Sequence, residues 1–393
     1  MTQWHPRTRA VRAGLARSSF DETSEALYLT SGYVYPNAAE AEAAFAGESD
    51  HMVYSRFTNP TVSMFADRLA DMEGAEACFA TSTGMSAVFV ALAALCSQGD
   101  RIVASRALFG SCFVVVDEVM RRFGVEPTFV DGHDLDQWRT ALAEPATAVF
   151  FETPSNPMLE LVDIPAVSEL AHAAGAQVVV DNVFGTPVFS RPLELGADIV
   201  VYSATKHFDG QGRVLGGAVL GSREFIERPV EQLVRNLGMS LSPFTAWVLV
   251  KGLETLQLRV EHMAASTLEI AGFLNGHPGV SRVWHPFLEA HPQHDLARRQ
   301  MTGAGTVVTF EVPGGKPAAF AVMDALEIFD ISNNLGDAKS LVTHPGTTTH
   351  RRLGPEGRAA AGITDGVVRL SIGLEDVGDL ITDLDQALGS VRP

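Results

Sequence analysis

Two residues that could do chemistry together stand at the ends of two neighbouring apolar runs. Asp181 closes the run at 177–181, and Lys206 comes 25 residues later, just after the run at 199–203. A nearly dry carboxylate is costly unless a cation faces it, and burial lowers the pKa of a lysine amine. Such an amine suits imine formation and proton transfer, and such a carboxylate suits a protonated ring nitrogen. Taken singly, Asp181 could be a helix or turn cap and Lys206 a surface ion pair.

A third strand end, at Ser82, Thr83, Gly84 and Met85, opens a helical stretch. The free backbone N–H groups and the helix dipole there could hold a phosphate, although an ordinary helix N-cap explains the same residues. The hydroxyls of Ser203 and Thr205, beside Lys206, could add donors. Because ligands of open α/β sheets lie beyond the carboxyl ends of the strands, these groups together predict a single site with an anion pocket, an acid and an amine.

The elements that must position these residues alternate between short apolar runs and amphipathic stretches. Helical stretches are expected at 85–95, 112–123 and 164–174, and crossovers of this length make neighbouring strands parallel. The pattern predicts an α/β large domain with a mostly parallel seven-stranded sheet. The expected strands are residues 77–80, 101–105, 128–130, 148–152, 177–181, 199–203 and 218–220.

After about residue 243 the regular alternation of short apolar runs and amphipathic stretches ends. The mixture of helices and strands expected there predicts a smaller C-terminal α+β domain. The division expected is an N-terminal arm at 1–50, a large domain at 51–245 and a small domain at 246–393. The arm has no strong period, so it should lie over another part of the protein or over a neighbouring subunit. The small domain should contain a long helix at 246–274, a strand at 306–312, a helix at 318–326, a strand at 367–372 and a last helix from Val377.

Composition excludes several classes of function. The 29 Lys+Arg against 47 Asp+Glu give a net charge of −18, which argues against nucleic acid or an anionic membrane as a partner. Three scattered cysteines fit neither a disulfide framework nor a cysteine-based zinc site, and the three histidines near residue 290 are separated by prolines, so no metal is expected. No dinucleotide fingerprint follows the first strand. Without a signal peptide or an apolar span, a cytoplasmic protein is expected.

Six motifs in this order resemble the Cys/Met-metabolism family of fold-type I pyridoxal-phosphate enzymes, and the likeness runs from about residue 29 to residue 388. They are YSRFTNPT from Tyr54, ATSTGMSA from Ala80, ETPSNP from Glu152, VDN from Val180, YSATKH from Tyr202 and RLSIGLE from Arg369.

The resemblance implies a role for each matching residue. Lys206 would carry pyridoxal 5'-phosphate as a Schiff base and shuttle protons, and Asp181 would face the ring nitrogen. Arg369 would bind the substrate α-carboxylate, with help from Asn156 and Ser340. Tyr54 and Arg56 would reach the phosphate of a neighbouring subunit, which makes a dimer obligatory and a tetramer the expected assembly; Tyr54 is also a candidate catalytic acid. The remaining cofactor-binding positions would be Gly84, Met85, Phe109, Ser203 and Thr205.

Two departures narrow the branch of the family. Phe109 stands where many members have a ring-stacking tyrosine, so the phenol that usually assists the leaving group is missing, and Tyr54 or Lys206 could cover its task. The segments at 209–213, 332–341 and 347–350 are more similar to the sulfhydrylases than to the lyases, and closest to the O-succinylhomoserine branch. The resemblance thus implies replacement of succinate by hydrosulfide to give homocysteine.

Several alternatives stay open at this point. They are a cystathionine γ-synthase, an O-acetylhomoserine sulfhydrylase, a methionine γ-lyase, and a non-catalytic protein that keeps the fold. A succinyl group carries a second carboxylate, so a further cation should meet it. Lys339, Arg106 and Arg351 are candidates, and solvated surface charge is the plainer explanation of each.

Overall fold

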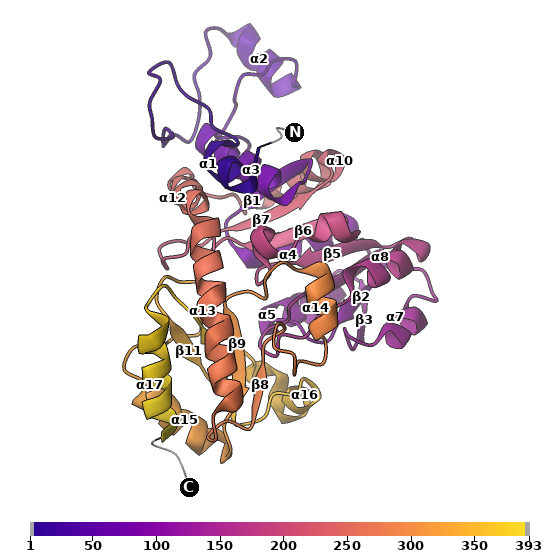
Figure 1. Ribbon diagram of the computed structural model, residues 1–393. Coiled ribbons are helices and arrows are strands. Elements are labelled where there is room, and N and C mark those ends of the chain that lie inside the picture. The colour runs from indigo at the N-terminus through magenta and orange to yellow at the C-terminus, as the bar shows by residue number, and fades with distance from the viewer. Residues whose placement is uncertain (1–3, 390–393) are drawn as a thin grey trace.

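The computed structural model describes residues 4–389, which form two β-sheets with helices around them (Figure 1). The first three residues of the expected arm and the last four of the expected small domain lie outside the described residues. Within the described range, no helix combines the length and the apolar character that crossing a membrane requires.

The first sheet has seven strands in the order β1-β7-β6-β5-β4-β2-β3. Strands β2 to β6 pair in parallel, and β7 runs antiparallel to both of its neighbours, β1 and β6. The predicted mostly parallel sheet and its seven strands are therefore confirmed. The strands are β1 Ala77–Thr81, β2 Arg101–Ser105, β3 Glu126–Val130, β4 Ala148–Glu152, β5 Gln177–Asp181, β6 Ile199–Ser203 and β7 Gly217–Gly221.

Helices cover both faces of this sheet, which is why its strands read as continuous Val, Ile and Phe runs. The central residues Val178, Val179 and Val180 of β5 have no exposed surface. The helices are α3 Pro60–Glu73, α4 Gly84–Leu95, α5 Gly110–Val114, α6 Met120–Arg122, α7 Leu135–Ala141, α8 Ile164–Ala173, α9 Thr186–Phe189, α10 Arg223–Phe225 and α11 Glu231–Leu237.

The second sheet has five strands in the order β10-β11-β12-β9-β8, antiparallel except for the pair β10–β11. Three helices, α13 Leu256–Gly276, α15 Gly315–Ala325 and α17 Val377–Gly389, pack on it through one apolar cluster (Figure 1). The expected domain boundary near residue 245 falls between the two sheets and stays a prediction. The strands are β8 Arg282–Trp284, β9 Val307–Glu311, β10 Asp330–Ile331, β11 Leu341–Thr343 and β12 Val367–Ser371; the helices are α14 His294–Gln300, α15 Gly315–Ala325, α16 Gly354–Ala360 and α17 Val377–Gly389.

The single long helix expected at 246–274 is wrong, because the chain forms two helices, α12 Pro243–Glu254 and α13 Leu256–Gly276. Between them Thr255 has φ −112° and ψ 5°, which are not helical values. Arg259 supports the break: its Nε donates to the Thr255 hydroxyl at 3.2 Å and its Nη2 to the Gly252 carbonyl at 2.8 Å. A buried guanidinium thus satisfies a carbonyl that the end of α12 leaves without a helical partner.

The N-terminal arm has two parts with different surroundings. Its first helix, α1 Pro6–Arg12, packs against α3, and Glu25 forms ion pairs with Arg68 of α3 and Lys251 of α12. The part that contains α2 Ala38–Ala46 stands away from the rest of the chain, at the top of Figure 1. Its apolar side chains include Val34 and Phe45, which are 90% and 72% exposed. This chain alone leaves that part of the arm uncovered.

Candidate active site

A cavity of about 250 Å³ lies where the carboxyl ends of strands in the first sheet meet strand β12 of the second. It brings together most of the residues that the sequence nominated, although they are spread over nearly 290 positions of the chain. The nominated residues that line it are Gly84, Met85, Phe109, Asn156, Asp181, Ser203, Thr205, Lys206 and Arg369.

Lys206 follows β6, and its side chain is held by the side-chain amide of Asn334, which lies between β10 and β11 of the second sheet. Its Nζ donates to Oδ1 of Asn334 at 2.5 Å. Burial, and after it the positive charge of Arg369, lowers the pKa of Lys206 to about 8. An amine with this pKa is available in its neutral, nucleophilic form far more often than an exposed lysine at neutral pH.

Asp181 is the last residue of β5 and contributes a carboxylate to the same cavity. Burial raises the pKa of this carboxyl group, and the N–H of Val183, which donates to Oδ1 at 3.1 Å, works against that rise. A carboxylate in such a place needs a cationic partner, and a protonated pyridine nitrogen is one.

The N-terminus of α4 forms the anion-binding wall. Thr83 is the N-cap residue and its hydroxyl accepts the N–H of Ser86, so the amides of Gly84 and Met85 are the first two of the helix and lack intrahelical acceptors. Gly84 is required by close approach: a Cβ at this position would lie 2.6 Å from Cβ of Ser203. The start of α4 and the end of β6 therefore meet as closely as their backbones allow. This contact places the amide N–H groups of α4 beside the hydroxyl of Ser203.

Arg369 comes from β12 of the second sheet and is 1% exposed. Its Nη1 donates to Oδ1 of Asn156 at 2.9 Å, and its Nη2 donates to the carbonyls of Asn333 and Asn334 at 3.1 and 3.0 Å. Its Nε has no hydrogen-bond partner within residues 4–389. Burial lowers the pKa of Arg369 to about 10, so it remains a cation at neutral pH. A fixed, incompletely paired guanidinium suits a carboxylate ligand.

The cavity also contains residues to which the sequence analysis gave no role. Asn333 and Cys112 belong to this group, and so does Glu152, the last residue of β4. Glu152 could have been found by its pattern, because it ends an apolar run just as Asp181 does.

Three nominated residues do not line this cavity. Ser340 is fully buried, and its hydroxyl donates to Oε2 of Glu375 and accepts the N–H of Gly373, both at 2.9 Å. Tyr54 is 41% exposed, and Arg56 lies with its guanidinium carbon 5.4 Å from the centre of the Tyr54 ring. The roles predicted for these residues stay predictions.

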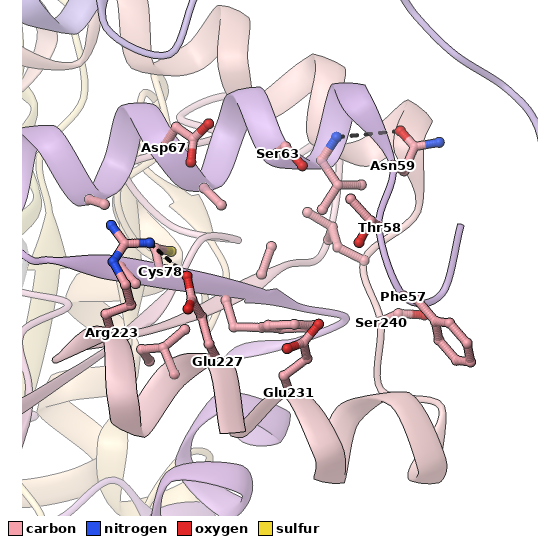
Figure 2. Close-up of a pocket in the computed structure, with 18 of the residues that line it drawn as sticks. Phe57, Thr58, Asn59, Ser63, Asp67, Cys78, Arg223, Glu227, Glu231 and Ser240 are labelled. Atoms are coloured by element: carbon pink, nitrogen blue, oxygen red, sulfur yellow. Dashed lines mark hydrogen bonds and ion pairs between the residues drawn. The ribbon is translucent and has the colours of Figure 1, made fainter. Parts of the chain in front are cut away.

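Arg56 instead lines a second cavity, of about 420 Å³, that runs along strand β1. Figure 2 shows Asp67 of α3 on one side of it, and Arg223, Glu227 and Glu231 on the other. This cavity presents carboxylates and arginines, and its lining, drawn from residues 4–389, has no lysine. It does not carry the amine and acid that the first cavity combines.

The three cations nominated for a second substrate carboxylate also lie outside the first cavity. Arg106 is ion-paired with Asp131, Lys339 lies 3.5 Å from Asp337, and Arg351 is exposed. The cations that line the cavity, within the described part of the chain, are Lys206 and Arg369.

The donor set fits pyridoxal 5'-phosphate. The clearest observation is the tight meeting of Gly84 with Ser203, which opens a row of N–H and hydroxyl donors where a phosphate could bind. Lys206 offers the amine that an aldehyde requires, and Asp181 offers the anion that a ring nitrogen requires. Phe109 contributes an aromatic ring to the cavity wall.

Comparisons with known proteins agree with this fit. The model of a family described as Cys/Met metabolism PLP-dependent enzyme matches residues 7–389. An O-succinylhomoserine sulfhydrylase of Mycobacterium tuberculosis is 63% identical over 97% of this chain and 95% of its own, and one of Pseudomonas aeruginosa is 49% identical over 98% and 95%. A solved structure from Campylobacter jejuni that contains N'-pyridoxyl-lysine-5'-monophosphate superposes with a TM-score of 0.94 at 31% identity, over 98% of this chain and all of that one.

Proposed function

Because the chain belongs to the Cys/Met-metabolism family of pyridoxal-phosphate-dependent enzymes, we propose that it replaces the succinate of O-succinyl-L-homoserine by hydrosulfide and releases L-homocysteine. The reaction makes it a transferase of methionine biosynthesis. The observation that carries the proposal is the 63% identity to an O-succinylhomoserine sulfhydrylase over nearly the whole chain. In the present chain, Lys206, Asp181 and Arg369 line one cavity.

Each residue of the cavity has a task in this reaction. Bound pyridoxal phosphate supplies an electron-withdrawing ring that stabilises negative charge on the substrate α-carbon. Arg369 binds the α-carboxylate, and Lys206 holds the cofactor through Nζ and then moves protons at the α- and β-carbons. Asp181 keeps the proton on the ring nitrogen. The amides of Gly84 and Met85, with the hydroxyls of Ser203 and Thr205, bind the phosphate.

The choice of hydrosulfide over cysteine rests on the wall of the cavity. Phe109, Val88, Phe184 and Leu335 make much of the lining apolar. A small nucleophile with one charge fits such a space better than a zwitterionic amino acid, whose ammonium and carboxylate groups would both need partners. Because position 109 lacks a phenol, Lys206 or Tyr54 of a neighbouring subunit would supply the acid for the leaving group.

A competition assay tests the proposal. Purified enzyme with pyridoxal phosphate is given succinyl- or acetyl-homoserine together with equal hydrosulfide and cysteine, and homocysteine and cystathionine are quantified. We expect homocysteine as the main product and a higher kcat/KM for the succinyl ester. Cystathionine as the main product, or a preference for the acetyl ester, would overturn the assignment. Borohydride reduction should fix the cofactor on Lys206, and Lys206→Ala should abolish this labelling.

The working form is proposed to be a dimer within a tetramer, in which Tyr54 and Arg56 of one subunit complete the cavity of another. Both residues lie outside the cavity of their own chain, and the arm that precedes them exposes apolar side chains. The three free thiols, Cys78, Cys96 and Cys112, agree with a reducing compartment, and we place the enzyme in the cytoplasm.

Subunit mixing tests the shared site. Arg56→Ala and Lys206→Ala variants, each inactive alone, are unfolded together, refolded and assayed. If Arg56 serves the neighbour, mixed dimers contain one intact site, and random pairing restores roughly a quarter of the sites. Activity that stays at the level of the separate variants would place Arg56 in its own subunit's site or outside catalysis.

A further inference from the structure

Glu152 shares a dry corner of the active-site cavity with Asp181. The two residues end the neighbouring parallel strands β4 and β5 and are partners in register. Side chains at paired positions point to the same face of a sheet, so both carboxyl groups face the cavity. The sulfur of Cys112 and one oxygen from each carboxyl group all lie within 4.8 Å of one another. Glu152 itself is 6% exposed.

Glu152 also holds the main chain of the aromatic wall. Its Oε1 accepts the N–H of Phe109 at 2.7 Å. Phe109 is the N-cap residue of α5, and its own side chain makes no capping hydrogen bond. The carboxyl group of a neighbouring strand therefore fixes the start of this short helix, and with it the place of the Phe109 ring in the cavity lining.

The two carboxyl groups and the thiol of Cys112 influence one another's pKa values in this corner. Burial, and after it the charge of Asp181, raises the pKa of Glu152. Asp181 accepts the N–H of Val183, which favours its ionised form, and a ring nitrogen would favour that form further. The thiol of Cys112 stays neutral because burial and Glu152 raise its pKa. Burial thus raises the pKa values of all three groups, which disfavours several negative charges together in this corner.

We propose that Glu152 is a positioning residue that acts through Phe109: as a hydrogen-bond acceptor it anchors the Phe109 main chain, and so fixes the aromatic wall beside the cofactor ring. The proposal requires the cofactor of the family. It does not require the acyl substrate or the nucleophile proposed above.

Three variants separate the hydrogen bond from the charge. Glu152→Gln keeps an oxygen acceptor at the same reach and carries no charge. Glu152→Asp keeps an acid but withdraws it by one methylene group, and Glu152→Ala removes the acceptor. The readouts are the dissociation constant of added pyridoxal 5'-phosphate and the visible circular dichroism of the bound chromophore, which reports how an asymmetric wall contacts the ring. Neither readout depends on turnover, so a failure of the sulfhydrylase assignment would leave them untouched.

We expect Glu152→Gln to bind the cofactor within about 2-fold of the unmodified enzyme, with the same dichroism, whereas loss of the hydrogen bond in Glu152→Asp and Glu152→Ala weakens binding by about 10-fold and diminishes the band. Glu160→Gln serves as the matched control, because this carboxyl group is also partly buried on the loop after β4 but lies outside the cavity lining; it should change neither readout.

Two results would overturn the proposal. If Glu152→Gln binds the cofactor as weakly as Glu152→Ala, the residue acts as a charge and not as an acceptor. If Glu152→Ala keeps the unmodified dissociation constant and dichroism, the contact with Phe109 positions nothing. Thermal unfolding would show whether Glu152→Ala folds. If it does not fold, the comparison of Glu152→Gln with Glu152→Asp still decides whether Glu152 acts as a hydrogen-bond acceptor or as a charge.

Discussion

The contact between Gly84 and Ser203 predicts that one added methyl group will disable the anion-binding wall. In Gly84→Ala the new Cβ would lie 2.6 Å from Cβ, 2.8 Å from Cα and 2.9 Å from Oγ of Ser203. Carbon atoms at rest lie about 3.5–4.0 Å apart. Because one of the contacts is with backbone, rotation of the serine side chain cannot relieve the clash, and either α4 or the end of β6 must move.

The size of the effect follows from these distances. Restoring ordinary contact needs a shift of about 1 Å, and an overpacked site of this kind costs about 1–3 kcal/mol of folding free energy. The amides of Gly84 and Met85 would be displaced by a similar amount, while hydrogen bonds to a phosphate keep their strength only within a range of about 0.5 Å. We therefore expect the affinity for pyridoxal phosphate to fall by at least about 10-fold.

Urea unfolding and cofactor titration measure the two effects separately. Gly272→Ala is the control, since Gly272 lies inside α13 and a Cβ there meets nothing within 4 Å. It should leave cofactor binding unchanged and stabilise the protein by up to about 1 kcal/mol, as alanine does in a helix. If Gly84→Ala has the stability and cofactor affinity of the unmodified enzyme, the close approach between Gly84 and Ser203 does not hold this wall together.

Three further predictions concern the carboxylate site, the aromatic wall and the arm. Arg369→Lys should raise KM for the amino-acid substrate by about 10- to 100-fold with a smaller change in kcat, because an ammonium group cannot replace a bidentate guanidinium. An unchanged KM in steady-state kinetics would contradict this prediction. Phe109→Tyr should increase ammonia release in the absence of hydrosulfide, because the phenol can protonate a leaving group; equal ammonia from both enzymes would count against it. Burial raises the pKa of Glu25, but ion pairs with Lys251 and Arg68 outweigh it and lower the pKa from 4.5 to about 2. The folded-state pKa is the lower one, so the stabilisation is complete above about pH 4.5 and is lost as the pH falls towards 2. Urea midpoints of Glu25→Gln should thus fall less between pH 5 and pH 3 than those of the unmodified protein, and parallel curves would refute this.

Local patterns in the sequence carried much of the site. Continuous apolar runs predicted the strands of the first sheet. Because parallel strands bring their carboxyl ends to one edge of the sheet, Asp181 and Lys206 could be predicted to lie close together. Gly84 could be nominated in the same way, because it opens a helix directly behind a strand. The family resemblance added Arg369, which its own strand pattern would not have singled out.

Other features could not be read from the chain alone. The break at Thr255 is invisible to helical periodicity, because it depends on Arg259 reaching a carbonyl of the preceding helix. The role of Glu152 was missed for a similar reason. Its neighbours Phe109 and Asp181 lie 43 and 29 positions away in the sequence, and they approach Glu152 only when β4 takes its place between β2 and β5.

The sequence by itself determined the strands of the first sheet and the residues that end them, because hydrophobic period and strand-end signals act over a few neighbouring residues. The tertiary structure decided which charges face one another. It placed the guanidinium of Arg369, from the second sheet, over a cavity made by the first, and it left Tyr54 and Arg56 outside that cavity. These outcomes follow from strand register and from the packing of one sheet against the other, which local sequence patterns do not encode.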